Sequence, residues 1–215
     1  MQQAPHSPMR IQQQEAAIKY GLEFKPLPEL VSVSDAKEHV IRALNNFSTN
    51  ILPTMLKDKL ANISAYKEAQ GLMPNLTQAK GLRDYRQKHP SHDPISVSNE
   101  LGQYGLPLTE GQILFHGGIF PTNLNQPTKS FLTNCPLSTT LCAQVAAVHS
   151  LNHEPKNIWL IRVTKNSTTK AVVYSNDNRQ THSHETEILI GEGASIILNS
   201  TFQVNDFTIY EVELK

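Results

Sequence analysis

The sequence has few cysteines, one tryptophan and no excess of either charge. Only Cys135 and Cys142 occur among 215 residues, which argues against a disulfide framework and favours a reducing compartment. Lysine plus arginine and aspartate plus glutamate number 19 each, so no net positive charge draws the chain toward nucleic acid or a membrane surface. The two cysteines are expected to be small buried fillers, and Trp159 is expected to lie in the core.

Long apolar runs are also missing. No segment approaches the roughly 20 apolar residues that cross a bilayer, and the first ten residues, MQQAPHSPMR, lack the apolar region of a signal peptide. These features predict a soluble cytoplasmic protein with no membrane partner. A dedicated secretion machine could deliver the protein into a target cell without a signal peptide, so action inside a target cell stays a possible location.

The residue pattern divides the chain into three parts. Residues 1–33 are rich in glutamine and proline and form an N-terminal extension, with a short helix expected over 12–20. Residues 34–95 form a helical lobe, in which apolar spacing predicts one helix after Asp35, a second from Pro53 to Gly71 and a third over 76–87. Residues 96–215 form a β-rich core, which we expect to be one structural unit with the lobe. Helices followed by strands indicate the α+β class.

The core contains several predicted strands and two predicted helices. A short helix fits residues 97–103, and a buried helix over 141–150 begins after Thr139 or Thr140 as its cap. Apolar runs bounded by turn residues predict strands over 112–116, 158–163, 171–174 and 207–214, and another that ends at 137–139.

The segment THSHETEILIGEGASII, residues 181–197, carries two acids in a strand pattern. Residues two apart in a strand share a face, so Glu185 and Glu187 are predicted to lie about 6–7 Å apart beside the buried run 188–190. Gly191 and Gly193 then allow a tight turn before a further strand over 195–198. Like charges at this separation raise one another's pKa, which suits acid, base or cation-stabilising work. Taken alone, two strand glutamates are more commonly a solvated face.

Three segments, ILFHGG, PLSTTLCAQVA and ETEILIGEG, occur in an order that resembles the ADP-ribosyltransferase superfamily, whose members use NAD as the donor. The first matches a strand with arginine or histidine followed by glycine. The second matches a Ser-Thr-Ser strand end before an alanine-containing helix, and the third matches the ExE motif. The matching residues are His116, Gly117, Ser138, Thr139, Thr140, Glu185 and Glu187.

The resemblance implies a split β-sheet core, with two antiparallel sheets packed at a large angle and NAD held between them. By the same resemblance, Glu187 stabilises the oxocarbenium-like ribose and Glu185 orients or deprotonates the acceptor. Ser138 braces Glu187 by a hydrogen bond. His116 contacts a ribose or phosphate of NAD, and the Gly117 backbone binds the carboxamide. Thr139 and Thr140 are assigned to NAD binding with them.

One position departs from the pattern, because relatives with Ser-Thr-Ser and ExE usually carry arginine where this chain has His116. Histidine at this position resembles the diphthamide-modifying and poly(ADP-ribose)-forming branches, so the branch stays open. With an ordinary pKa near 6.5, His116 is expected to make activity depend on pH between about 5.5 and 7.5. The loop over 175–184 lacks the aromatic residue of several relatives, and Arg179, Gln180 or His182 is expected to recognise the acceptor.

We therefore expect a mono-ADP-ribosyltransferase of toxin or effector type, with NAD as co-substrate and no metal. The neutral charge favours a protein acceptor over nucleic acid, and Glu185 favours arginine. An inhibitor or antitoxin protein is a further expected partner. Alternatives are modification of RNA or DNA bases, NAD glycohydrolysis, an inactive NAD-binding or partner-binding module, and a zinc site built from His149, His153, His182 and His184.

Overall fold

The computed structural model describes residues 36–45, 51–174 and 185–215. All of these residues lie in one compact unit, Val31–Lys215. The helix expected over 12–20 and the loop over 175–184 lie outside the described residues. The boundaries expected at residues 33 and 95 stay predictions.

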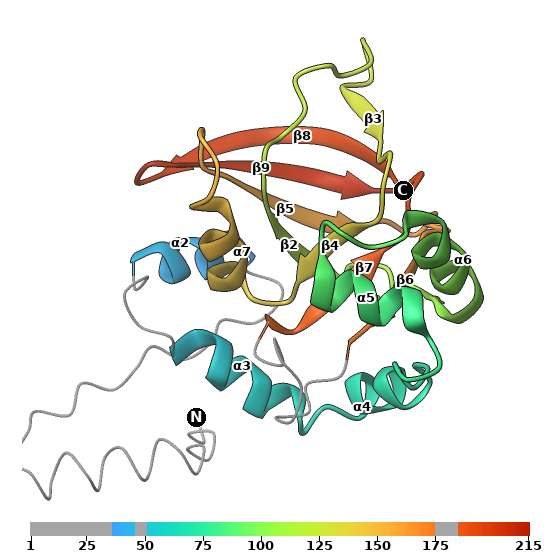
Figure 1. Cartoon of the computed structure of the whole chain (residues 1–215). Helices are drawn as coiled ribbons and strands as arrows, with labels where there is room; N and C mark the ends of the chain where they lie inside the picture. The colour runs from blue at the N-terminus through green and yellow to red at the C-terminus, as the bar shows by residue number, and fades with distance from the viewer. Residues whose placement is uncertain (1–35, 46–50, 175–184) are drawn as a thin grey trace, which may run out of the picture. The chain divides into compact units, whose positions relative to one another are not determined.

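The described helices and strands confirm the α+β class (Figure 1). The helices are α2 (Ala36–Asn45), α3 (Ile51–Leu60), α4 (Ser64–Gly71), α5 (Lys80–Lys88), α6 (Pro94–Tyr104) and α7 (Ala143–Ser150). The strands are β1 (Leu106–Pro107), β2 (Ile113–Gly117), β3 (Ser130–Leu132), β4 (Leu137–Thr140), β5 (Asn157–Val163), β6 (Lys170–Val173), β7 (Glu187–Ile190), β8 (Ser195–Val204) and β9 (Phe207–Leu214).

Three helix predictions need correction. The helix expected over 53–71 is two helices, because the backbone is extended at Ile63 and the Asn62 side chain donates to the carbonyl of Asp58. The helix expected from residue 76 begins at Lys80, after an Asn75 side chain that accepts from the backbone N–H of Thr77. Helix α6 is longer than expected because Asp93 caps it and Pro94 occupies its first turn.

The described strands form one hydrogen-bonded sheet in the order β1-β6-β7-β4-β2-β5-β9-β8-β3. Two separate antiparallel sheets were expected; instead β5 and β9 are parallel, and the halves β1-β6-β7-β4 and β2-β5-β9-β8-β3 are joined. The junction between β2 and β4 consists of one registered pair, Phe115 with Thr140, among the residues described. In Figure 1, β4 and β7 run at an angle to the long strands β8 and β9. The sheet is thus nearly split at the β2–β4 seam.

Helix α7 covers this seam. It contacts strands β2, β4 and β5 as well as helices α2 and α3. Most of its residues are buried, as the apolar sequence predicts: Ala143, Gln144, Val145, Ala146, Ala147 and Ser150. A side chain at Gly117 of β2 would place its Cβ 1.8 Å from the Ala146 carbonyl oxygen. Gly117 therefore allows α7 to approach the sheet closely.

Helices α5 and α6 lie against the other half of the sheet. They pack on β6 and β7 through a buried cluster formed by Ala79, Leu82, Tyr85, Val97, Leu101, Val172, Tyr174 and Leu189. The Glu100 carboxylate on α6 accepts the backbone N–H groups of Gly81 (3.0 Å) and Leu82 (2.8 Å). These N–H groups lie at the start of α5 and have no partner within the helix, so Glu100 caps the helix. Its negative charge also interacts favourably with the positive end of the helix dipole. This packing fixes the orientation of α5 and therefore the position of its C-terminal end.

The contact between α5 and α6 predicts opposite effects for two glycine substitutions. A Cβ on Gly81 would lie 2.7 Å from the backbone carbon of Ser96, whereas a Cβ on Gly102 in α6 would meet nothing within 4 Å. Gly81→Ala should therefore lower the free energy of unfolding by about 1–3 kcal/mol through overpacking. Gly102→Ala should raise it by about 0.5–1 kcal/mol because alanine restricts the unfolded chain. Urea unfolding of both variants checks this, and equal effects would contradict the close contact.

Candidate active site

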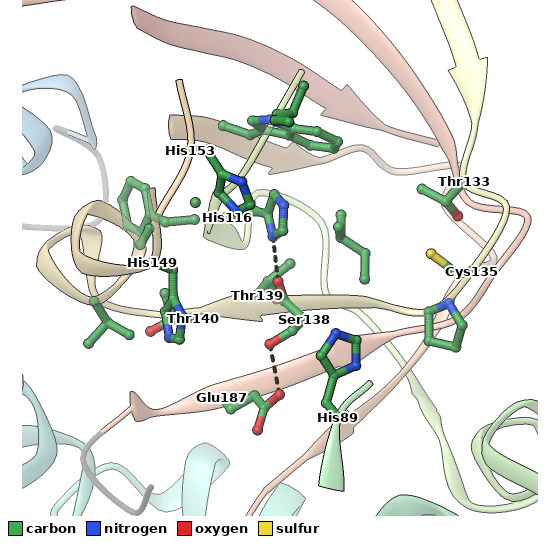
Figure 2. A pocket seen from close by; sticks show the side chains of 18 of the residues that line it. His89, His116, Thr133, Cys135, Ser138, Thr139, Thr140, His149, His153 and Glu187 are labelled. Atoms are coloured by element: carbon green, nitrogen blue, oxygen red, sulfur yellow. Dashed lines mark hydrogen bonds between the residues drawn. The ribbon is translucent and has the colours of Figure 1, made fainter. Parts of the chain in front are cut away.

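A cavity of about 900 Å³ lies at the seam of the sheet. Its walls come from the end of α5, from β2 and β4, from the segment 119–135, from α7 and from the turn that precedes β7. This volume lies in the range of small-molecule and cofactor sites. Figure 2 shows side chains that line it, among them Ser138, His116 and Glu187.

Ser138 and Glu187 meet because β4 pairs with β7. The Ser138 hydroxyl donates to Glu187 Oε1 at 2.7 Å, which is the hydrogen bond that the motif resemblance implies (Figure 2). Glu187 is almost completely buried, with a side-chain exposure of 7%. A buried carboxylate is costly unless its oxygens are hydrogen bonded or paired, so Ser138 holds Glu187 in one orientation.

His116 is joined to the same serine. Its Nδ1–H donates to the Ser138 carbonyl at 2.7 Å, and its ring packs edge-on against Trp159, with the centroids 4.7 Å apart (Figure 2). A carbonyl can only accept, so the neutral ring carries its proton on Nδ1 and has a lone pair on Nε2. A Cβ at Gly118 would lie 2.5 Å from Nε2, so this glycine makes room for the ring.

Burial lowers the pKa of His116 to about 4, opposed by the hydrogen bond to Ser138, and the neighbouring His149 and His153 lower it further. The pKa near 6.5 expected from the sequence is therefore wrong, since burial disfavours the charged imidazolium. His116 stays neutral over the range in which its titration was expected to change activity.

Thr139 and Thr140 border the cavity, but their hydroxyls bond to the backbone. Thr139 donates to the carbonyl of Ile188 at 2.6 Å, and Thr140 donates to the carbonyl of Glu185 at 2.5 Å. The Thr140 hydroxyl also accepts a hydrogen bond from the backbone N–H of Cys142 at 3.0 Å, and Cys142 is the residue that precedes α7. These bonds tie β4 to β7 and to the turn before it.

Glu185 and Glu187 do not share a regular strand, which corrects the expected geometry. Strand β7 begins at Glu187, and Thr186 has a φ of 46°. Positive φ is unfavourable for a β-branched residue, and such strain is concentrated at functional sites. Thr186 is fully buried, and its hydroxyl donates to the carbonyl of Glu185 at 2.7 Å. Glu185 therefore lies outside β7, in a preceding turn that the Thr140 and Thr186 hydroxyls hold in place.

Arg86 was not predicted from the sequence. Its Nε lies 3.6 Å from Glu187 Oε2, and the exposed fractions of the two side chains are 3% and 7%. The guanidinium also lies over the ring of Tyr174 at 4.8 Å. A signal was available, because Arg86 stands at i+4 from the buried Leu82 and so continues the buried face of α5.

Other predicted positions have different outcomes. Trp159 and Cys142 are buried, as expected, and burial raises the pKa of the Cys142 thiol. Cys135 is exposed and borders the cavity, so the prediction that it is a buried filler is wrong. Within the described ranges, no three histidine, cysteine or acidic side chains lie close enough to hold a metal ion. The loop residues expected to take part in recognition or metal binding lie outside those ranges: Arg179, Gln180, His182 and His184.

No helix in the described part of the chain is long and apolar enough to cross a membrane.

Comparison with known proteins gives structural similarity without sequence matches. No family model matches the chain, and no curated protein sequence matches it. The Vis toxin, an ADP-ribosyltransferase from Vibrio splendidus, is 16% identical, with a TM-score of 0.40 over 89% of this chain and 88% of that chain. The C3 exoenzyme of Clostridium limosum is also 16% identical, with a TM-score of 0.40 over 89% and 98%. C3larvin, an ADP-ribosyltransferase from Paenibacillus larvae, is 10% identical, with a TM-score of 0.44 over 71% and 94%.

Two buried histidines predict acid sensitivity of the fold. The pKa of His116 and that of His39 on α2 are both lowered to about 4 by burial. The unfolded chain then binds more protons than the folded protein between pH 6.5 and 4, so the free energy of unfolding should fall as the pH falls through that window. Urea unfolding from pH 7.5 to 4.5 measures the slope. His116→Asn and His39→Asn should each make it shallower, and an unchanged slope in both variants would contradict the assignment.

Proposed function

We propose that this protein is a mono-ADP-ribosyltransferase that cleaves the bond between nicotinamide and ribose in NAD and transfers ADP-ribose to a macromolecule. The observation that carries the proposal is the hydrogen-bonded series His116, Ser138 and Glu187, which joins one residue from each of the three motifs in one cavity. These residues are separated by 22 and 49 positions in the chain. Three motifs that matched by chance would have no reason to meet in this way.

Glu187 supplies the charge that bond cleavage requires. As nicotinamide leaves, positive charge develops on the ribose, and a fixed carboxylate beside it lowers the barrier. Ser138 holds Oε1 and Arg86 lies near Oε2, so the carboxylate is oriented before NAD arrives. Preorganisation of this kind avoids the cost of turning dipoles during the reaction.

His116 and the backbone of Gly117 form the NAD side of the site. The lone pair on the neutral His116 Nε2 can accept a hydrogen bond from a ribose hydroxyl, whereas a protonated ring could not. Gly117 lies at the end of β2 on the cavity wall, where its backbone can meet the carboxamide of NAD. NAD enters as a co-substrate and leaves as nicotinamide and transferred ADP-ribose.

Glu185 forms the acceptor side, in the turn that Thr140 and Thr186 fix. A carboxylate suits an arginine acceptor, because guanidinium pairs with it through two parallel hydrogen bonds. The zero net charge of the chain supports a protein acceptor over nucleic acid. An enzyme of toxin or effector type, acting inside a target cell and held inactive by an inhibitor protein where it is made, accords with this activity.

Labelled NAD tests the activity and the acceptor class together. The protein is incubated with NAD labelled in its adenylate and with a soluble cell extract, and the products are treated separately with protease and nuclease. Label that becomes acid-soluble only after protease treatment supports a protein acceptor, and label released by nuclease would identify nucleic acid. Absence of both nicotinamide release and incorporated label would overturn the proposal.

Glu187→Gln should lower nicotinamide release by about a hundredfold or more, since it keeps the shape and removes the charge that stabilises the oxocarbenium-like ribose. Glu192→Gln is the matched control, because Glu192 is an exposed acid five positions further on that does not border the cavity. Nicotinamide release measured by chromatography compares them. Full activity in Glu187→Gln would remove this residue from the mechanism.

Glu185→Gln should separate the two half-reactions. Only the acceptor requires Glu185, so incorporated label should fall by about a hundredfold while nicotinamide release falls far less. The quantity to measure is the ratio of incorporated ADP-ribose to nicotinamide released from the same reaction. A ratio equal to that of the unmodified protein would show that the two acids are not divided in this way.

A further inference from the structure

The last turn of α7 places an imidazole opposite Glu185. His149 Nε2 lies 3.9 Å from Glu185 Oε1, and the exposed fractions of the two side chains are 54% and 18%. Both residues border the cavity, and Figure 2 shows His149 on the same wall as Thr140. The roles proposed for Glu185 and Glu187 leave His149 without one.

The two groups stand on backbone that packing fixes independently on each side. Helix α7 is held against β2, because a Cβ on Gly117 would collide with the Ala146 carbonyl and with the backbone nitrogen of Ser150. The carbonyl of Glu185 accepts hydrogen bonds from the hydroxyls of both Thr140 and Thr186. The approach of His149 to Glu185 is therefore set by the fold and not by two flexible surface chains.

The distance between His149 and Glu185 suits an acceptor group that contacts both side chains. At 3.9 Å, His149 Nε2 and Glu185 Oε1 are too far apart for a direct hydrogen bond. An acceptor nitrogen or oxygen beside the pair can lie at ordinary hydrogen-bond distances of about 2.7–3.2 Å from both atoms. Imidazole is also the side chain that most readily exchanges a proton near neutral pH.

The charged surroundings of His149 are defined by the neighbouring elements. His116 faces it from β2, and His153 follows it in the chain. On α2, Lys37 pairs with Glu211, Arg42 pairs with Glu38, and His39 packs against Phe115. On α3 the charged side chains are Lys57, Asp58 and Lys59, of which Asp58 and Lys59 are exposed. Glu185 is the acid within ion-pairing distance of His149 in the described part of the chain.

We propose that His149 is the general base for the acceptor, with Glu185 orienting the acceptor and stabilising the imidazolium that forms. This inference rests on the proposed function. The bond from ribose C1′ to nicotinamide breaks, and its electron pair leaves on the nicotinamide nitrogen. A lone pair of the acceptor forms the new bond to C1′, and the acceptor proton passes to His149 Nε2. Because His149 is half exposed, the imidazolium then returns this proton to solvent.

Cleavage and transfer should therefore respond differently to His149. Cleavage depends on charge stabilisation by Glu187, whereas proton removal matters when the acceptor attacks. In His149→Gln, the ratio of incorporated ADP-ribose to nicotinamide released should fall by about a hundredfold, the scale of a lost general base.

The test uses the full chain, adenylate-labelled NAD and a soluble cell extract, with acid-precipitable label and nicotinamide measured in each reaction. Val148→Gln is the matched control, since Val148 is the exposed neighbour of His149 on α7 and does not border the cavity; its ratio should equal that of the unmodified protein. His149→Ala is a second variant, and thermal unfolding confirms that each protein is folded.

The ratio of transfer to cleavage decides whether His149 acts as the base. A reduced ratio in both folded variants, with nicotinamide release retained, supports the inference. An unchanged ratio in folded His149→Gln and His149→Ala overturns it while the proposed function stands. An equal loss of cleavage and transfer also overturns it, because His149 would then act before the acceptor does. If the unmodified protein releases nicotinamide without incorporating label, the transfer step of the proposed function fails and the inference fails with it, and if it releases none, the whole proposed function fails.

Discussion

The site depends on one buried carboxylate that is kept in place by two different interactions. Glu187 accepts a hydrogen bond from Ser138 on one oxygen and lies in ion-pairing distance of Arg86 on the other. Removing either partner would leave a largely buried charged group partly uncompensated. Glu187 depends on three features of the fold. The pairing of β4 with β7 brings Ser138 to it, and the packing of α5 on the buried cluster around Tyr174 brings Arg86 to it.

The near-split sheet explains how such a site can exist in a single sheet. Strands β2 and β4 diverge after one registered pair, and the space that opens beside them is the cavity. His116 is the next-to-last residue of the strand on one side of the seam, and Ser138 lies in the strand on the other. The hydrogen bond between them spans the gap where the ladder has stopped, so it substitutes for sheet pairing at that point.

Much of the fold could be predicted because local pattern determines it. The alternation in 207–214, the apolar runs in 158–163 and 171–174 and the buried helix near 141–150 all lie where the sequence places them. The parallel pairing of β5 with β9 could not be predicted, since these strands are about fifty residues apart and nothing local specifies their partner. The helix break at Ile63 escaped prediction for another reason, because it depends on a side-chain contact with the helix backbone.

The site shows the same division. The hydrogen bond between Ser138 and Glu187 could be expected because the motif resemblance implies it, whereas the strand pattern alone does not say which strands pair. The turn at Glu185 was misjudged as strand, since the Glu185 carbonyl is held by the hydroxyl of Thr140, 45 positions away, and Thr186 has a positive φ. Arg86 was missed because its role requires α5 to lie across β7, and the pKa of His116 was misjudged because burial is a property of the folded protein.

The surroundings of His116 limit how this position can change over evolutionary time. Its ring occupies the volume that a side chain at residue 118 would fill, rests against Trp159 and bonds to a main-chain oxygen rather than to a side chain. A longer, permanently charged arginine could also donate to that oxygen, but its guanidinium would have to fit into the space beside the indole that the imidazole now fills. Mutational drift from histidine to arginine would thus need compensating substitutions at Trp159 and its neighbours. The two forms of the motif are separated by a barrier of coupled substitutions, so a lineage that has adopted one would rarely exchange it for the other.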